Sequence, residues 1–498
     1  MTQMTGTNRR TFLRRAASGA GAVWVSSLQD FSVAQALGNT SGDSPYGLPS
    51  PKIDGTTGLK LLQLPDGFRY WSYSWTGDLM SDGIKVPALH DGMAVVDEWH
   101  DDDDNDHGHD DRDGRRHGDD DDDDKQWDDD RWNRSGKLVL VRNHEPGQGT
   151  PYLANRPDIT FAADGAGGTT NLVFDARNGK WLRSWSSLAG TIRNCAGGVT
   201  PWGTWITCEE TTLVGHGWSF EVGALKGNPK PIVSMGRFSH EANMVDPATG
   251  YVYETEDADL CGFFKFVPNR RGRLHSGGRL YMLRVRNEPN ADLGVTHPVG
   301  TSWKVDWVRI DDPLAQTLSC YEQGAAKGGA TFRRLEGAWW GDRTGYFLST
   351  NGGAPVVTGA GPTEGEGQVF EYDPRRERLT LIYESQSADT LENPDNMTVT
   401  PRGGLLLCED NAGINAVRSE RLIGLTPKGK AFTFGINNIN FTEPGFGAPP
   451  NPTIAPNDFR TQEWAGACYS PDGRWLFVNI QTPGVTFAIT GPWHKGPL

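Results

Sequence analysis

The sequence predicts an all-β fold, in the form of a six-bladed β-propeller that makes up one closed domain. Three observations lead to this prediction: strand-like segments follow one another along the chain, a hairpin pattern recurs six times, and Gly, Pro and Trp are abundant. Each copy starts on a polar or acidic residue, turns at a Gly-containing step, and ends its second strand on acids or amides. A pair of β-sandwiches is the competing architecture.

Residues 1–36, ahead of the first hairpin, are typical of a Tat export signal. A twin-arginine pattern at Arg9 and Arg10 precedes a weakly apolar run of small residues, which ends in an A-x-A cleavage site at Ala34–Ala36. We expect the Tat machinery to export the chain and the mature domain, residues 37–498, to be soluble in the periplasm or secreted. No later stretch approaches about 18 uninterrupted apolar residues, so the mature form is expected to stay off membranes.

The first hairpin copy carries an acidic insertion. Its two halves are "HDGMAVVDE" from His90 and "SGKLVLVRNHE" ending at Glu145, separated by an Asp/His-rich tract at about residues 99–133. Residues 101–131 hold seventeen Asp against five Lys or Arg, which accounts for most of the net charge of -15. We expect this tract to be a disordered loop at the hairpin tip. The rest of the chain has no basic face that would indicate nucleic-acid binding.

Five further copies follow the first. They are "NCAGGVTPWGTWITCEE" from Asn194, "HEANMVDPATGYVYETED" from His240, "LEGAWWGDRTGYFLSTNGG" from Leu335, "LENPDNMTVTPRGGLLLCED" from Leu391 and "EWAGACYSPDGRWLFVNIQ" from Glu463. The first and last residues of a hairpin lie at the same edge of its sheet. A propeller would therefore gather all of the polar hairpin ends on one face, around its central channel.

Carboxylates dominate these hairpin ends, and many like charges on one rim repel unless cations neutralise them. Oxygen-rich sites suit calcium. The candidate ligands from this pattern are Glu145, Glu209, Glu210, Glu241, Asp257, Glu336, Glu392, Glu409 and Asp410, with the amides of Asn351, Asn393 and Asn396. The ordinary alternative is that polar residues at strand ends are simply solvated.

Two further residues stand out near these ends. Cys195 occupies a place where the other copies have an acid, and a thiolate among carboxylates suits a transition metal such as iron. Arg418 follows the Asp410 end closely and has the planar fork that binds phosphate, although an exposed Arg is more often ordinary surface. The six cysteines are dispersed in apolar strands, which favours buried free thiols over a disulfide framework.

Several of these stretches resemble the PhoX family of exported bacterial alkaline phosphatases. They span nearly the whole mature chain, and the run around Cys195 is the most specific of them. The stretches are "RNHE", "GGTTNL", "GTIRNCAGGVTPWGTWITCEE", "GRFSHEA", "LEGAWW", "LENPDN" and "EWAGACYSPDGRWLFVNIQTPG". Two features depart from the family pattern: the chain is compact, as in a shorter branch, and the Asp/His insertion is extra.

The resemblance implies a six-bladed propeller with a mixed Fe³⁺ and Ca²⁺ cluster that hydrolyses small phosphate monoesters at alkaline pH. It implies Cys195 as an iron ligand, and Arg418 as a phosphate-binding residue that acts with Glu420. Further implied ligands are Glu210, Glu241, Asp257, Glu336 and Glu420.

Two other functions stay open at this point. One is a calcium-dependent propeller hydrolase of the lactonase type, in which a single calcium held by Glu and Asn suffices. The other is a non-catalytic propeller that binds a cation or a partner. A closed propeller has few exposed edges, so we expect a monomer.

Overall fold

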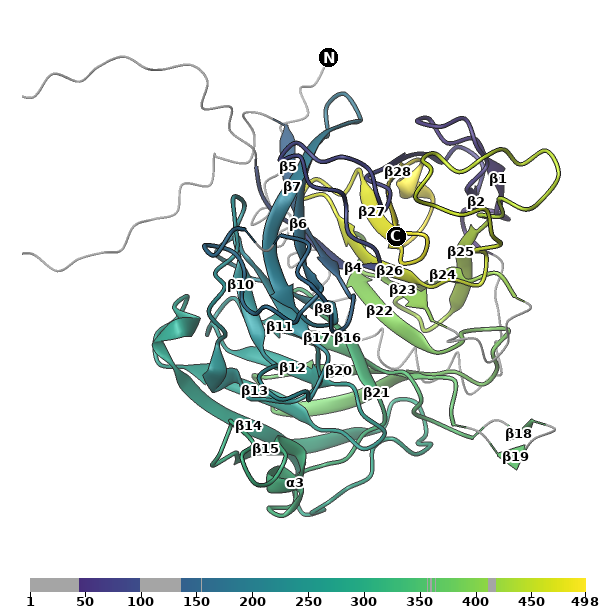
Figure 1. Cartoon of the computed structure of the whole chain (residues 1–498). Coiled ribbons are helices and arrows are strands. Elements are labelled where there is room, and N and C mark those ends of the chain that lie inside the picture. Colours follow the sequence, from purple (N-terminus) through teal and green to yellow (C-terminus); the bar gives the residue numbers. More distant parts are fainter. Residues whose placement is uncertain are drawn as a thin grey trace, which may run out of the picture.

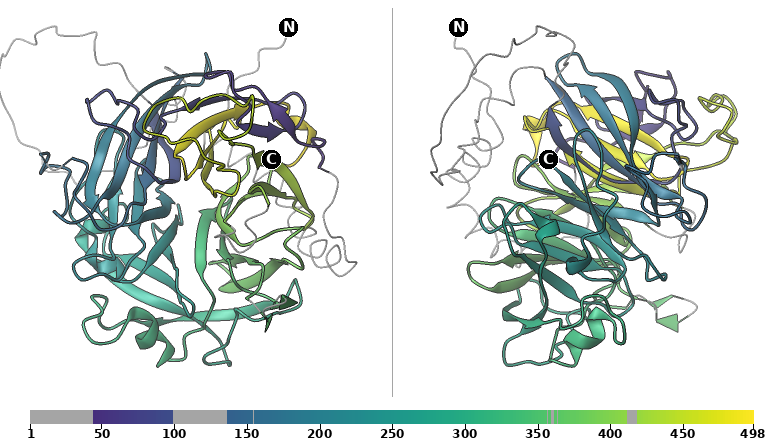
Figure 2. Two further views of the ribbon diagram at one scale, coloured as in Figure 1. Left: turned by 45° about the vertical axis from the view of Figure 1, so that its right-hand side comes forward. Right: turned by 60° about the vertical axis from the view of Figure 1, so that its left-hand side comes forward.

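The computed structural model is all-β, with its sheets arranged like the blades of a propeller around a central axis (Figures 1 and 2). The structure describes residues 44–98, 136–153, 155–355, 357–358, 361–362, 364–410 and 418–498. The predicted export signal and the predicted Asp/His-rich insertion lie outside these residues. The described part includes one short α-helix, α3 (Cys320–Ala325), and none of its helices is long and apolar enough to cross a membrane.

Six strands form a closed ring at the centre of the described residues, because each contacts the next and the last contacts the first. They are β4 (His90–Glu98), β8 (Asn194–Val199), β11 (His240–Val245), β16 (Leu335–Trp340), β22 (Pro394–Val399) and β26 (Trp464–Tyr469). Each pairs antiparallel with the strand that follows it, as the hairpin repeats predict. These second strands are β5 (Lys137–His144), β9 (Trp205–Glu209), β12 (Val252–Glu256), β17 (Gly345–Ser349), β23 (Leu405–Glu409) and β27 (Leu476–Ile480).

Three of the sheets extend one hairpin each in a simple way. The sheet β4-β5-β6-β7 consists of the first hairpin together with β6 (Gly167–Asp175) and β7 (Lys180–Thr191). The sheet β10-β9-β8 consists of the second hairpin together with β10 (Ser219–Val222). The order β26-β27-β28-β3 adds β28 (Val485–Thr490) and β3 (Arg69–Tyr73). In this last sheet a strand from the start of the described chain pairs with one from its end, and Figure 2 shows these purple and yellow strands side by side.

Two other sheets are larger than a single blade. One has the order β1-β2-β25-β24-β23-β22, with β1 (Ser50–Lys52), β2 (Leu62–Leu64), β24 (Arg421–Leu425) and β25 (Ala431–Asn437). A nine-stranded sheet, β11-β12-β13-β14-β15-β21-β20-β17-β16, contains β13 (Phe263–Pro268), β14 (Gly278–Val285), β15 (Ser302–Arg309), β20 (Gln368–Asp373) and β21 (Arg378–Glu384). A separate two-stranded ribbon consists of β18 (Val357–Thr358) and β19 (Gly361–Pro362).

The sequence correctly predicts an all-β, propeller-like arrangement, but the sheets do not separate into six distinct blades. Two of the expected blades are joined because the edge strands β15 and β21 pair, with Trp303 opposite Leu379. An unpaired strand edge offers free backbone N–H and C=O groups to any neighbouring edge, so two outer strands of adjacent repeats can bond to each other. Whether β15 and β21 meet depends on the lengths of two strands that lie far apart in the sequence. The repeat pattern does not encode these lengths.

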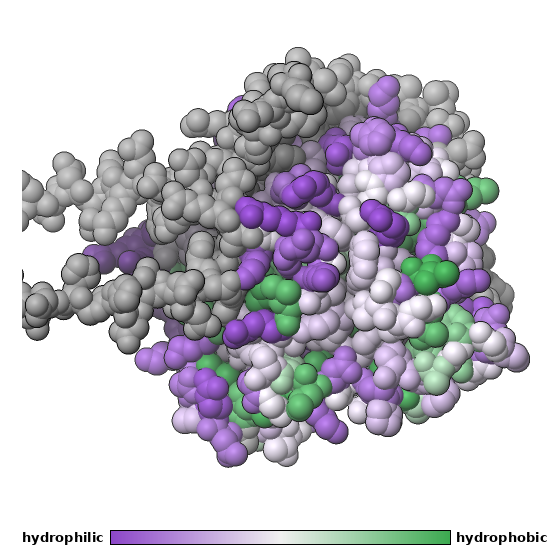
Figure 3. Space-filling view, turned by 90° about the horizontal axis from the view of Figure 1, so that it is seen from above, coloured by the Kyte–Doolittle hydropathy of each residue, from purple (hydrophilic) through white to green (hydrophobic). Residues whose placement is uncertain are grey.

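The core lies between neighbouring repeats, including the two repeats that share the nine-stranded sheet. The ring of Phe263 on β13 stacks on that of Phe347 on β17, with centroids 4.2 Å apart, and both side chains are fully buried. Burying such a side chain contributes about 1.5–3 kcal/mol. All six cysteines are buried and free, which confirms the prediction of buried free thiols over a disulfide framework. On the face seen in Figure 3, hydrophobic residues lie in separate small groups among hydrophilic ones.

Candidate metal centre at one end of the ring

Each strand of the ring has a β-bulge near its first residues. The register shifts between His90 and Met93, Asn194 and Gly197, His240 and Asn243, Leu335 and Ala338, Pro394 and Asn396, and Ala465 and Cys468. A bulge leaves a residue unpaired and re-aims its side chain. In five of these described strands a potential ligand follows the first residue of the bulge: Asp91, Cys195, Glu241, Glu336 and Asp395.

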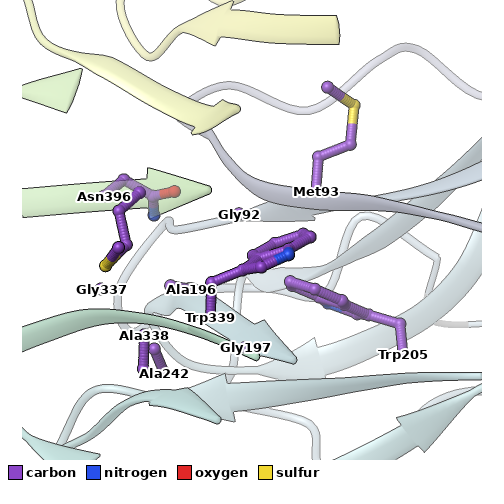
Figure 4. Close-up of a pocket in the computed structure, with 11 residues that line it drawn as sticks. Gly92, Met93, Ala196, Gly197, Trp205, Ala242, Gly337, Ala338, Trp339 and Asn396 are labelled. Carbon is purple, nitrogen blue, oxygen red and sulfur yellow. The ribbon is translucent and has the colours of Figure 1, made fainter. Parts of the chain in front are cut away.

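Small residues next to these bulge positions allow the ring strands to approach closely. A Cβ added to Gly92 would lie 2.6 Å from Cα of Ala196, and one added to Gly337 would lie 2.6 Å from the carbonyl oxygen of Asp395. Only glycine fits such backbone contacts. Gly92, Ala196 and Gly337 line a pocket within the ring that also includes Trp339 (Figure 4). The ring is therefore narrow here, and the side chains at the bulges converge.

The convergence produces two groups of potential metal ligands. In the first, ligand atoms of Asp91, Glu145 and Cys195 all lie within 4.8 Å of one another, and in the second the same holds for Cys195, Glu241 and Asp395. Cys195 belongs to both groups, and its Sγ lies 3.7 Å from Oδ2 of Asp91. Residues far apart along the chain, from four different hairpins, thus share one end of the ring.

A second layer of acids surrounds these groups and comes from the far ends of the hairpins. Glu145, Glu210, Asp257 and Asp410 directly follow the second strands β5, β9, β12 and β23. Their charges act on the bulge residues, since Asp410, Asp257 and Glu145 all raise the pKa of Asp395 and Asp257 raises that of Glu336. Glu463, just before β26, completes the layer: burial raises its pKa, and Asp410, Asp91 and Asp395 raise it further.

The bulge residues have strongly shifted pKa values. Burial raises the pKa of Glu241 well above its usual range, and Glu336, Asp395 and Glu210 raise it further. Burial is likewise the main cause that raises the pKa of Asp395 to about 8 and that of the Cys195 thiol well above normal. These shifts show that the chain alone does not compensate the charge it gathers here.

Unpaired oxygen atoms point to the same conclusion. Glu241 is fully buried, and neither of its carboxylate oxygens has a hydrogen-bond partner among the described residues. Oδ1 of Asp395 is also buried without a partner in this part of the chain. A buried carboxylate without compensation costs several kcal/mol, whereas a bound cation would satisfy it. The donor set, carboxylate oxygens with one sulfur, fits hard cations together with a transition metal.

Two arginines lie among these acids, and sequence reasoning missed both. Nη2 of Arg193 lies 2.9 Å from Oε1 of Glu145, and the same guanidinium bonds Glu210. Nε of Arg334 donates to Oδ1 of Asp257 at 3.0 Å, and its Nη2 pairs with Glu336. The acids raise the pKa of both arginines above the usual value. Both residues therefore stay charged beside the centre.

The structure places three predicted site residues to one side of the two ligand groups. Arg418 donates from Nη2 to Oδ1 of Asp389 at 2.7 Å, and its Nη1 lies 3.7 Å from Oε2 of Glu392. Glu420 is buried directly before β24, which begins at Arg421. Among the described residues, none of Glu392, Arg418 and Glu420 belongs to either ligand group. Residues 411–417, directly before Arg418, lie outside the described residues.

Sequence reasoning also left Asp91, Asp395 and Glu463 out of the candidate ligands. A signal for Asp91 was present, because an acid or Cys195 followed by a small residue recurs as Asp91-Gly92, Cys195-Ala196, Glu241-Ala242 and Glu336-Gly337. In "LENPDN" two acids compete for this place. The bulge in β22 gives it to Asp395 and leaves Glu392 outside.

The chain was compared with known proteins. The family described as alkaline phosphatase PhoX matches residues 49–484. A comparison with curated protein sequences gave no match. Among solved structures, the chain is similar to Pseudomonas fluorescens PhoX in complex with vanadate, a transition state analogue, with 16% identity, a TM-score of 0.58, and coverage of 92% of this chain and 99% of that one.

Weaker similarities also occur. One is with a putative gluconolactonase, at 9% identity and a TM-score of 0.34, covering 86% of this chain and 93% of the other. Another is with the PQQ domain of pyranose dehydrogenase from Coprinopsis cinerea, at 11% identity and a TM-score of 0.37, covering 89% and 100%. The match over residues 49–484 covers most of the sequence, and the chain therefore belongs to the alkaline phosphatase PhoX family and is a phosphatase.

Proposed function

We propose that this phosphatase is exported by the Tat machinery and hydrolyses small phosphate monoesters at alkaline pH, using an iron and calcium cluster at one end of its propeller-like ring of strands. The observation that carries the proposal is the sharing of Cys195 by two groups of ligand atoms. A calcium site needs no thiol, so this position argues for a transition metal beside calcium.

The proposed ligands are residues that converge at the bulges and around them. Cys195 would contribute to both metal positions, with Asp91 and Glu145 on one side and Glu241 and Asp395 on the other. Glu210, Asp257, Glu336 and Asp410 supply further carboxylates around these positions. Ligand roles for Glu392 and Glu420, and a substrate role for Arg418, stay predictions.

The chain's own residues prepare the site for a phosphate ester. The close approach of Gly92 to Ala196 and of Gly337 to Asp395 holds the ligand side chains in fixed places before any substrate arrives. Bound cations would supply the positive charge that neutralises the phosphoryl oxygens. Trp339 and the small residues around it fill the ring next to the ligands, which keeps the centre from opening into a wide water-filled channel (Figure 4).

The test is an assay with an aryl phosphate at about pH 9, near the alkaline end of the range in which carboxylates with raised pKa values ionise. Natively exported protein is measured before and after chelation, and iron and calcium are then returned separately and together, with elemental analysis of each sample. We expect phosphate release that is lost on chelation and restored only by both metals. Release that survives chelation would refute the metal centre, and recovery with calcium alone would refute the role of iron.

Two other parts of the proposal have tests of their own. Replacing Arg9 and Arg10 by Lys should leave the full-length chain in the cytoplasm, which cell fractionation measures. The proposed monomer is checked by light scattering on the purified mature protein. A twin-lysine chain that is still exported, or a stable dimer, would contradict the respective statement.

A further inference from the structure

Trp339 lies across the interior of the ring of strands. It belongs to β16, which is the strand opposite β4, since three steps separate the two in either direction around the ring. Its side chain packs against three hydrophobic clusters, which contain Met397 of β22, Met93 of β4 and Trp205 of β9. All four residues line one pocket (Figure 4). The indole of Trp339 therefore reaches from its own strand to the opposite side of the ring.

This pocket lies next to the ligand residues, on the side away from the second layer of acids. Five of its lining residues directly follow the five ligand residues of the ring strands: Gly92, Ala196, Ala242, Gly337 and Asn396. The ring strands start at the ligand end, so each of these residues lies one step farther toward the other end. Trp339 comes three residues after Glu336 and lies farther still in the same direction. It stands between the ligands and the far end of the ring.

The exposure of the side chains agrees with this order. The five ligand residues of the ring strands are at most 6% exposed, whereas Trp339 is partly exposed. Solvent that reaches the indole thus does not reach the ligands beyond it. The other residues around the indole are mostly small, namely Gly92, Ala196, Gly197, Ala242, Gly337 and Ala338. Without the indole they would leave room for water, whose molecules occupy about 30 Å³ each in the liquid.

The wall of the ring is closed at several junctions between its strands. β4 meets β8, and β16 meets β22, through the glycine contacts described above. At a third junction, a Cβ added to Gly466 of β26 would lie 2.5 Å from the carbonyl oxygen of Asp91 in β4. At a fourth, one added to Gly198 of β8 would meet the carbonyl oxygen of Asn243 in β11. Backbones this close leave no passage for a hydrated cation, so the ends of the ring are the main routes to the ligands.

We propose that Trp339 is a plug that closes the far end of the ring, so that cations enter and leave the metal centre through the face that carries the second layer of acids. The inference rests on the metal centre of the proposed function and assigns a role to a residue that is not a ligand. A cation that passed the indole would lose its hydration without gaining a partner, which is strongly unfavourable. The acids at the open face instead attract cations.

The experiment measures the exchange of calcium on natively loaded protein. An excess of a calcium chelator gives the rate of calcium loss, mixing of calcium with the calcium-depleted protein gives the rate of uptake, and titration gives the affinity. The variants are Trp339→Ala and Trp339→Phe. Trp340→Ala is the matched control, because Trp340 is the next residue of β16 and is also partly exposed. Its ring stacks on that of Tyr253, with centroids 6.1 Å apart, in a different hydrophobic cluster.

We expect Trp339→Ala to raise the rates of calcium loss and uptake together by about 10-fold or more, which corresponds to about 1.4 kcal/mol of barrier. The affinity stays at the wild-type value, because a plug changes the barrier between the free and bound states and not the states themselves. Trp339→Phe, which keeps an aromatic ring, gives a smaller increase and carries the test if Trp339→Ala fails to fold. Trp340→Ala exchanges calcium like the wild type.

Three results would overturn the plug. One is unchanged exchange rates in both Trp339 variants, and another is equal acceleration by Trp340→Ala. The third is faster loss with weaker affinity and unchanged uptake, which would show that Trp339 only supports the positions of the ligands. The proposed function fails separately: protein that exchanges calcium as expected but releases no phosphate from aryl phosphates would reject the phosphatase reaction and leave the plug in place.

Discussion

Glu209 and Glu210 are neighbours in sequence, yet their carboxylates lie on opposite sides of the end of β9 and have different partners. Glu209 is buried away from the centre and accepts hydrogen bonds from the backbone N–H groups of Ile192 at 2.9 Å and Gly217 at 2.9 Å. Glu210 instead bonds Arg193 beside the two groups of potential ligands. Successive side chains of a strand point to opposite faces. Glu409 and Asp410 repeat this division, since Glu409 bonds Arg421 while Asp410 acts on Asp395.

This division predicts different effects of the same substitution at the two positions. Glu209→Gln should lower the free energy of unfolding by about 1–3 kcal/mol, with or without metal, because it weakens a charged acceptor of several N–H groups. Glu210→Gln should leave the chelated protein at least as stable as the wild type, because it removes one of several repelling acids, while it lowers calcium affinity. Guanidinium unfolding in chelator and calcium titration measure the two effects. Equal destabilisation by both substitutions would contradict the assignment.

The metal-free protein should lose stability as the pH rises. The folded-state pKa of Asp395 is raised from 3.8 to about 8, and those of Asp91, Glu241 and Glu336 are raised in the same direction. Between the unfolded and folded pKa values the folded chain holds protons that the unfolded chain has released. The stability is therefore full below about pH 4, decreases as the pH rises, and levels off above the folded pKa values.

The measurement is the melting temperature of chelated protein at intervals between about pH 5 and about pH 9, compared with protein saturated with calcium. We expect a fall for the chelated protein and a much flatter profile with calcium. Glu241→Gln serves as the internal control, because it removes one titrating group and should make the chelated profile less steep. A chelated protein that becomes more stable over this range would show that the buried acids are compensated in another way.

Cys195→Ser should remove iron and leave the fold intact. The thiol is the one sulfur in the two ligand groups of the described residues, and a hydroxyl is a poor substitute for a thiolate with a transition metal. We expect iron content and phosphatase activity to fall together, with an unchanged circular dichroism spectrum. Cys320→Ser is the matched control: Cys320 is also buried, but its Sγ donates to the backbone oxygens of Arg237 and Pro313 and belongs to neither ligand group in the described part of the chain. Iron retained by Cys195→Ser would contradict the assignment.

Gly337→Ala tests the close packing of the ring. The added Cβ would meet the carbonyl oxygen of Asp395 at 2.6 Å, so β16 and β22 must separate. Overpacking of this kind costs about 1–3 kcal/mol. Because the shift moves Asp395, we also expect weaker metal binding. Gly147→Ala, where an added Cβ meets no atom within 4 Å, should change neither the unfolding midpoint nor the metal content. If Gly337→Ala behaves like this control, the ring is looser than its glycines indicate.

Local sequence determines the hairpins of this protein and the polar character of their ends. The predicted starts at Asn194, His240 and Leu335 coincide with the first residues of β8, β11 and β16. Turn residues and strand periodicity act over a few neighbouring positions, so a single chain displays them openly. The same pattern predicts that Cys195 and Glu241 meet, because each lies near the start of a hairpin and a propeller gathers the hairpin ends on one face.

Only the tertiary structure decides which acid of a hairpin end faces the centre. Because of the bulge in β22, Asp395 takes the place that Glu392 was expected to share. Arg193 and Arg334 reach the acids through a left-handed turn. The union of two expected blades through β15 and β21 has the same origin. Bulges, rare backbone conformations and edge pairing depend on contacts between segments far apart in the chain, and these contacts exist only once the ring has closed.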